Sequence, residues 1–183
     1  MCGVKTNVVT AVEIRDKDAS DTKLLPPLLD TTAERFTMRE VSADKGYGSL
    51  SNYEAVAAHG AVPYIAFKSI HTGKGGGVWA KMYHFYQYQR DEFLTHYHKR
   101  SNVESTFSMM KAKFGDSLRS KRDVAMVNEA LCKVLCHNIC CLIQSIYELG
   151  ITATFWGRSD CGGESPTPSL EIEDCDLDAW AWV

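Results

Sequence analysis

The sequence lacks the features that would assign it to several specialised classes of protein. Its 183 residues contain no apolar run that approaches the ~20 residues of a membrane-spanning helix. The first residues, MCGVKTNVV, have neither the basic start nor the long apolar stretch of a signal peptide. With 45% hydrophobic and 23% charged residues, the composition is that of one globular domain able to bury a core. We therefore expect a cytoplasmic protein with no membrane partner.

The seven cysteines follow neither a disulfide pattern nor the CxxC spacing of structural zinc sites. Cys132, Cys136 and Cys140 recur every four residues beside His137, which places them along one stripe of a helix. A zinc site is one interpretation of this stripe. Buried free cysteine is common, however, so we expect reduced thiols that pack in the core.

The net charge of -3 is distributed very unevenly along the chain. Residues 68–122 hold eleven Lys or Arg against four Asp or Glu, whereas residues 159–183 hold seven acidic and no basic residues. A basic segment suits a polyanionic partner, because phosphate neutralisation with counterion release supplies most nonspecific affinity for nucleic acids. Composition alone leaves a solvated charged face as the alternative.

The spacing of apolar residues predicts strands that alternate with helices. We expect strands over residues 8–15, 38–43 and 61–67, and helices over residues 24–36, 49–60, 93–115 and 124–149. The aromatic stretch 79–88 is either core or a stacking surface for bases. This order indicates an α/β domain around a mixed sheet, with the apolar helix at 124–149 packed beneath it.

The helix expected at 93–115 places four polar residues on one face. At about 100° per residue, Tyr97, Arg100, Glu104 and Lys111 lie within roughly 60° of one another. Exposed ion pairs on helices contribute only a few tenths of a kcal/mol, so stability alone gives little reason for this grouping. A carboxylate between two cations suits phosphate chemistry better, although spacing alone leaves a chance grouping open. The adjoining apolar face is expected to pack on the sheet through Val103, Phe107, Met110 and Phe114.

The string HYHKRSNVESTFSMMKAKFG resembles the signature Y-x2-R-x3-E-x6-K of the prokaryotic insertion-sequence DDE transposases, in the group that shares this YREK pattern. Every spacing of the signature is kept. The segment SADKGYGS, which follows the expected strand at 38–43, is similar to the segment of the same families that carries the second catalytic acid. The similarity extends over nearly all of residues 1–157.

The resemblance implies a ribonuclease-H-like fold, a mixed sheet flanked by helices, over residues 1–157. The remaining residues, 158–183, are rich in Gly, Ser, Pro and acidic residues, which predicts an acidic flexible tail. It implies phosphodiester cleavage and strand transfer at acids that bind two divalent metal ions, Mg²⁺ or Mn²⁺. Asp44 matches the second acid and Glu104 the third. The implied partners are double-stranded DNA at the transposon ends and either a second copy or an intact transposase. The residues implied to contact DNA phosphates are Tyr97, Arg100 and Lys111.

One part of the family pattern is missing, namely the first catalytic aspartate, which the family carries on the first strand of the sheet. Thr6-Asn7 before the expected strand at 8–15 indicate a hairpin that begins at about residue 1. The family's first strand would lie upstream of this hairpin, whereas Asp16, Asp18 and Asp21 all follow it. We therefore expect the C-terminal part of a transposase, without its first strand and inactive or severely impaired alone. Two alternatives stay open: a DNA-binding remnant that inhibits an intact transposase, and a ribonuclease-H-like nuclease unrelated to transposition.

Overall fold

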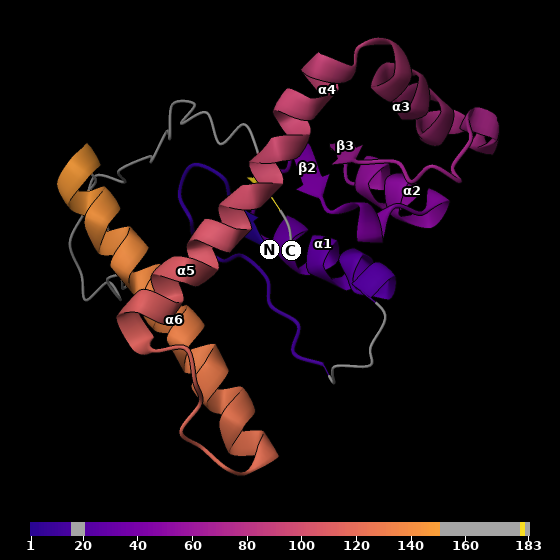
Figure 1. The fold of residues 1–183 in the computed structure, drawn as a ribbon. Coiled ribbons are helices and arrows are strands. Elements are labelled where there is room, and N and C mark those ends of the chain that lie inside the picture. Colours follow the sequence, from indigo (N-terminus) through magenta and orange to yellow (C-terminus); the bar gives the residue numbers. More distant parts are fainter. Residues whose placement is uncertain (16–20, 151–179, 182–183) are drawn as a thin grey trace, which may run out of the picture.

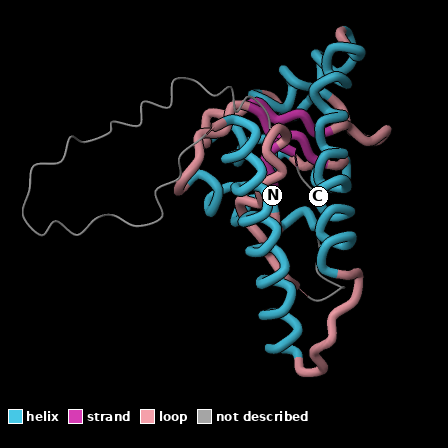
Figure 2. The backbone as a smooth tube through the Cα atoms, turned by 90° about the vertical axis from the view of Figure 1, so that its left-hand side faces the viewer, coloured by secondary structure: helices cyan, strands magenta, loops and turns pink. Residues whose placement is uncertain are grey.

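The computed structural model describes residues 1–15, 21–150 and 180–181. Within them it contains a small sheet and long helices (Figures 1 and 2). The strands are β1 (Cys2–Gly3), β2 (Glu40–Ala43), β3 (Val62–Ile65) and β4 (Trp180–Ala181). The α-helices are α1 (Leu25–Ala33), α2 (Leu50–Ala58), α3 (Gly77–Tyr88), α4 (Arg90–Tyr97), α5 (Asn102–Phe114) and α6 (Asp123–Leu149).

The four strands form one mixed sheet in the order β1-β4-β2-β3, which confirms the predicted α/β class. β2 runs parallel to β3 and to β4, and β1 runs antiparallel to β4. The last three residues of β2, Val41, Ser42 and Ala43, are completely buried, as expected for a strand covered on both faces. β4 comes from the segment expected to be a flexible tail, and the rest of that segment, residues 158–179 and 182–183, lies outside the described residues.

The strand predicted at residues 8–15 is confirmed only as a short backbone pairing with the first residues of the chain. Val9 forms an antiparallel bridge with Cys2, flanked by hydrogen bonds from the Gly3 amide to the Val8 carbonyl and from the Thr10 amide to the Met1 carbonyl, each 2.9 Å long. The Val9 amide donates to the Asn138 side-chain oxygen at 2.8 Å, and the Asn138 side-chain nitrogen donates to the Val9 carbonyl at 2.7 Å. The Asn138 side chain of α6 therefore satisfies both backbone groups of Val9, which the pairing with the first residues leaves free.

The aromatic stretch at 79–88, for which the sequence left two interpretations, lies within helix α3. Its inner face is core, because Trp79 and Met82 are buried and the Trp79 ring meets Tyr53 of α2 edge-on at 5.1 Å. Its outer face is not, since Tyr88 is 83% exposed at the C-terminal end of the helix. The core interpretation is thus confirmed for the inner face, and a stacking surface for bases stays a prediction for the outer face.

The single helix predicted at 93–115 is interrupted. α4 ends at Tyr97, a 3-10 turn covers His98–Ser101, and α5 begins at Asn102. The apolar stripe expected along it also differs, because Val103 and Met110 are buried whereas Phe107 is 46% exposed.

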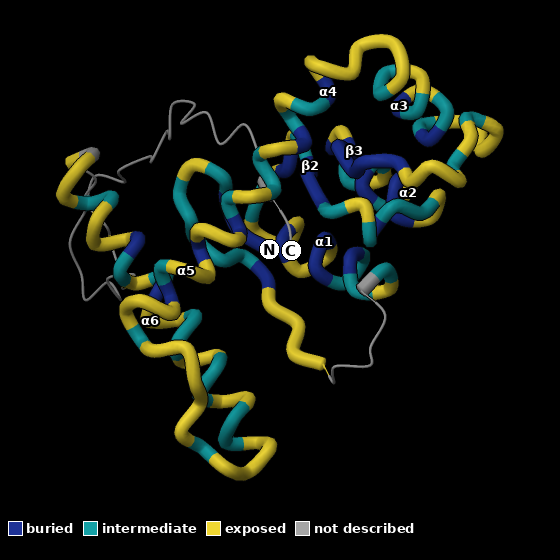
Figure 3. Tube along the Cα trace, viewed as in Figure 1, coloured by how far each residue is buried: buried dark blue, intermediate teal, exposed yellow. Residues whose placement is uncertain are grey.

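The prediction that α6 packs beneath the domain on most of its sides is wrong. Its inner face contacts the protein, where His137 is completely buried and its Nε2 lies 2.9 Å from the Asn7 carbonyl oxygen. The rest of the helix is largely exposed (Figure 3). Cys132 and Cys136 are accordingly exposed free thiols and not core residues, Cys140 is half-buried, and Cys141 is the buried cysteine of this helix.

The expectation that no apolar run approaches the length of a membrane-spanning helix also needs correction. By length and composition only, Asp123–Glu148 is long and apolar enough to cross a membrane, and 11% of its most apolar window is buried. The polar contacts of its inner face, through His137 and Asn138, attach it instead to the first nine residues of the chain.

Replacing Asn138 by Ala should lower the free energy of unfolding by about 1 to 3 kcal/mol, because the Val9 amide and carbonyl both lose their partner. Urea unfolding followed by circular dichroism measures this loss. Gln144→Ala, at an exposed position of the same helix, should change the free energy by no more than about 0.5 kcal/mol. Equal effects of the two substitutions would show that Asn138 does not attach the N-terminal segment.

Candidate functional site

Asp44 stands directly after the last residue of β2, at the C-terminal edge of the parallel strand pair. Its backbone is still extended, with φ -64° and ψ 153°, and its Oδ1 accepts a hydrogen bond from the Lys45 amide at 2.8 Å. This contact caps the 3-10 turn Lys45–Tyr47, which carries the chain away from the sheet. The carboxylate is therefore held at the sheet edge and is half-buried.

Helix α4 is attached to the sheet one residue before Tyr97. The Ser42 hydroxyl of β2 donates to the His96 carbonyl at 2.9 Å, and the His96 ring stacks on Tyr64 of β3 with centroids 4.3 Å apart. Glu40 Oε2 lies 2.8 Å from His96 Nδ1 and 3.2 Å from Lys99 Nζ. These contacts fix the end of α4 against β2 and β3.

Tyr97 consequently reaches the end of β2. Its ring is buried, and its hydroxyl donates to Asp44 Oδ1 at 3.2 Å. Burial raises the pKa of Tyr97, and the negative charge of Asp44 raises it further, whereas Arg100 lowers it. Tyr97 therefore stays a hydrogen-bond donor to the carboxylate at neutral pH.

Arg100 connects this pair to the second acid. Its guanidinium carbon lies 5.3 Å from the centre of the Tyr97 ring, and its Nη1 donates to Glu104 Oε1 at 3.4 Å. Burial acts to lower the pKa of Arg100, but Tyr97, Asp44 and Glu104 outweigh it and the pKa is raised. The guanidinium Nε is buried and has no hydrogen-bond partner among the residues that the structure describes.

The structure thus brings four of the five predicted site residues into one connected group. Asp44 contacts Tyr97, Tyr97 contacts Arg100, and Arg100 contacts Glu104. The two acids are 60 positions apart in the sequence, and they lie directly after β2 and in α5. The Glu104 side chain is 73% exposed, so its carboxylate is open to solvent or to a ligand.

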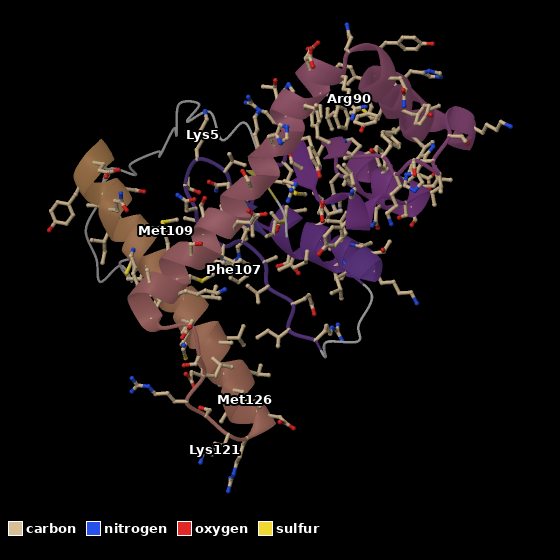
Figure 4. All side chains as sticks on the ribbon, in the orientation of Figure 1. Lys5, Arg90, Phe107, Met109, Lys121 and Met126 are labelled. Carbon is tan, nitrogen blue, oxygen red and sulfur yellow. The ribbon has the colours of Figure 1, made fainter. Side chains whose placement is uncertain are left out.

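Lys111, the fifth predicted residue, stands apart from this group. It is seven residues beyond Glu104 on α5, about 10 Å along the helix axis. There it lines a largely apolar cavity of about 510 Å³ together with Phe107 and Met110 of the same helix, and Tyr47, three residues after Asp44, lines it too. Figure 4 labels Phe107 on this part of α5.

The two carboxylates are the right type of ligand for a divalent cation, but they are too few to form a complete metal site. Carboxylate oxygens are the ligands that Mg²⁺ and Mn²⁺ prefer, and Asp44 and Glu104 offer them beside one arginine. In residues 1–15, 21–150 and 180–181, no group of three His, Cys, Asp or Glu side chains is placed to hold a metal ion.

The sequence interpretation did not single out the residues that position the group. Glu40, His96 and Lys99 form the ion-pair cluster that attaches α4, and Ser42 adds a hydrogen bond. The run of basic residues in HYHKR was a signal for the α4 side of this cluster. No signal in the sequence indicated that Glu40, on β2, would face these basic residues.

Comparison with known families assigns the chain. The family model described as "Transposase DDE domain" matches residues 1–139, which is most of the chain, so the protein belongs to this family. The match includes both acids and the whole Tyr97–Lys111 segment. Searches of curated proteins and of solved structures gave no match.

Membership of this family indicates the general fold and the general chemistry of the chain. The family implies a ribonuclease-H-like fold, DNA as the substrate and the use of divalent metal ions. The mixed sheet agrees with that fold, although β1 and β4 have only two residues each. Asp44 and Glu104 are the acids that the structure connects within the matched region.

Replacing Tyr97 by Phe should lower the free energy of unfolding by about 1 kcal/mol, because Asp44 loses a donor inside a partly buried site. Thermal unfolding provides the measurement. Tyr88→Phe removes a hydroxyl from a ring that is 83% exposed and serves as the matched control, with no expected change. An unchanged stability of the Tyr97 variant would show that its hydroxyl does not hold the Asp44 carboxylate.

Proposed function

We propose that this chain is the acid- and phosphate-binding part of an insertion-sequence transposase of the YREK-signature group, which acts on transposon-end DNA in the cytoplasm. The observation that carries the proposal is the group Asp44–Tyr97–Arg100–Glu104, in which two acids from distant elements meet at one tyrosine and one arginine. A charged helix face without function would have no reason to reach the end of β2.

Asp44 and Glu104 are the residues that would hold a divalent cation, Mg²⁺ or Mn²⁺. When bound, such ions activate water or a DNA 3′-hydroxyl and stabilise the leaving oxygen of the phosphodiester. Asp44 has the more fixed position, because the Lys45 amide and the Tyr97 hydroxyl both hold its Oδ1. Glu104 is the more exposed acid, and its position depends on α5.

Arg100 is the residue best placed to bind a DNA phosphate. Its guanidinium stacks beside the Tyr97 ring, and its Nε keeps a donor with no partner in the described part of the chain. An unpaired buried donor is costly, and a phosphate oxygen satisfies it with a charge-assisted hydrogen bond. Lys111 supplies a single positive charge for another phosphate, two helical turns beyond Glu104 along α5.

We propose further that the two acids do not suffice for catalysis. The reaction of the family uses three acids, and the described residues place no third carboxylate with Asp44 and Glu104. A further strand bearing an acid, or an intact transposase as partner, would have to supply it. A second copy of the chain is also a proposed partner, because two transposon ends need two DNA-binding sites.

The alternative function is that of a DNA-binding remnant that inhibits an intact transposase. The single observation that favours it is the same incomplete acid set. A remnant needs Arg100 and Lys111 for phosphates but has no need of a cation at Asp44 and Glu104, so metal binding distinguishes the two functions.

The acid variants test the proposed metal site in the chain by itself. Asp44→Asn and Glu104→Gln should each weaken Mn²⁺ binding about tenfold or more, because each removes a negatively charged ligand. Isothermal titration calorimetry measures the affinity. Glu54→Gln, on the exposed face of α2, should leave it unchanged. Binding of Mn²⁺ that survives both substitutions would favour the remnant.

The basic variants test the proposed phosphate contacts. Arg100→Ala and Lys111→Ala should each weaken binding to transposon-end duplex DNA, and each should reduce the slope of log K against log salt by about one. Fluorescence anisotropy over a series of salt concentrations provides both values. Arg35→Ala, at an exposed position after α1, is the control for total charge. A slope that falls equally in all three variants would refute specific contacts.

A further inference from the structure

Strand β4 occupies an interior position of the sheet, although it comes from the opposite end of the chain to its neighbour β1. It runs antiparallel to β1, with Ala181 opposite Cys2, and parallel to β2, with Ala181 beside Ser42. Among the described residues β1 and β2 form no ladder with each other, so β4 joins them. The sheet therefore has room for one strand between β1 and β2, and β4 fills this gap.

The gap is next to the candidate site. Paired residues of neighbouring strands share a face of the sheet, and so do residues two apart along one strand. The Ser42 hydroxyl donates to the His96 carbonyl of α4, and Asp44, two residues after Ser42, accepts from Tyr97 of the same helix. Position 181, in register with Ser42, is thus on the face that α4 covers. β4 also lies against the 3-10 turn that follows α4.

A carboxylate at position 181 would be close enough to Asp44 to share a cation with it. Neighbouring strands are about 4.8 Å apart and two residues of a strand span about 6.6 Å, which gives a diagonal of about 8 Å between the two backbone positions. Two aspartates at this separation reach one divalent cation between them. The described residues place no third carboxylate with Asp44 and Glu104, and a strand in this gap would supply one.

While β4 fills the gap, no other strand enters it, and alanine at position 181 has no group that binds a metal ion. The attachment of β4 is short. It pairs over two residues with each neighbour, whereas β2 and β3 pair over four. Withdrawal of β4 therefore leaves the β2–β3 pairing and the attachment of α4 in place, and it exposes two unpaired strand edges that face one gap.

We propose that β4 is an autoinhibitory strand, which blocks the sheet position that an acid-bearing strand must take. The site becomes complete only after β4 leaves. The segment that replaces it is an extended peptide with a carboxylate at the level of Ser42, parallel to β2 and antiparallel to β1, bound by main-chain hydrogen bonds on both sides. This inference rests on the proposed function for the need of a third acid. The location and the exchange of β4 do not depend on it.

A disulfide tests the location of β4 without metal or DNA. Opposite residues of an antiparallel pair have Cα atoms about 4.5 to 5.5 Å apart, which suits a disulfide. Ala181→Cys should therefore cross-link to Cys2 on mild oxidation, in alkaline buffer because burial raises the pKa of the Cys2 thiol. Peptide mapping by mass spectrometry identifies the linkage. Ser169→Cys, earlier in the same segment, should give no linkage to Cys2. Absence of the linkage in the Ala181→Cys variant would overturn the inference.

A labelled synthetic peptide of residues 176–183, DLDAWAWV, tests the exchange by fluorescence anisotropy. Ala181→Pro removes a backbone donor from β4, so this variant should bind the peptide about tenfold or more tightly than the unchanged chain. Ser169→Pro, next to Pro168, should bind it as the unchanged chain does. The oxidised Ala181→Cys variant should not bind it until the disulfide is reduced. Equal binding to all these forms would show that β4 does not block the gap.

Mn²⁺ affinity tests the connection with the acids. Ala181→Asp should tighten Mn²⁺ binding of the full chain about tenfold or more, because it adds a third carboxylate on the α4 face, and Asp44→Asn should cancel the gain. Ala58→Asp, at an exposed position of α2, should leave the affinity unchanged. The same aspartate, supplied within the peptide to the Ala181→Pro chain, should give the same gain without depending on the stability of β4 in the variant.

The outcomes separate this inference from the proposed function. A disulfide that forms as expected, with no gain of Mn²⁺ affinity from the aspartate in either arrangement, would overturn the role of the gap in completing the site. An unchanged chain that binds no Mn²⁺ would count against the metal site at Asp44 and Glu104, whereas the disulfide and the peptide would still report whether β4 blocks the gap.

Discussion

The attachment of α4 to the sheet is the constraint on which the rest of the candidate site depends. A buried serine, a stacked histidine and a glutamate shared between His96 and Lys99 hold the end of this helix against β2 and β3. None of these groups belongs to the proposed reaction. They determine where Tyr97 lies, and Tyr97 determines how the carboxylate at the end of β2 is oriented. The chemistry therefore rests on packing that sequence signatures do not contain.

Much of the fold could be predicted from local patterns. The strands β2 and β3 and most of α1 and α2 follow from the spacing of apolar residues, because their burial is regular along each element. The bounds of α6 were predicted to within one residue. The strand predicted over residues 8–15 is shorter than the alternation indicated, because the described backbone hydrogen bonds to the first residues reach no further than Ala11. The prediction that α6 packs beneath the domain was wrong because an apolar helix surface does not indicate whether the same chain covers it.

The candidate site was predictable to a similar degree. A helical wheel places Tyr97, Arg100, Glu104 and Lys111 together, and three of them do meet. Contact with Asp44, 53 residues before Tyr97, could not follow from periodicity, because it depends on how a helix crosses a strand. Only the family resemblance indicated this contact. The separation of Lys111 from the group is a matter of distance along the helix axis, which a wheel does not represent.

The 3-10 turn His98–Ser101 has a mechanical consequence for the two acids. It lies between the part of the chain fixed to the sheet and the helix that carries Glu104, and such turns inside long helices are common hinge positions. The start of α5 is nevertheless held, because the Asn102 side chain donates to the Gly3 carbonyl at 3.2 Å and to Asn7 Oδ1 at 2.9 Å. The separation of Glu104 from Asp44 therefore depends on the first residues of the chain, which contribute no group to the candidate site themselves.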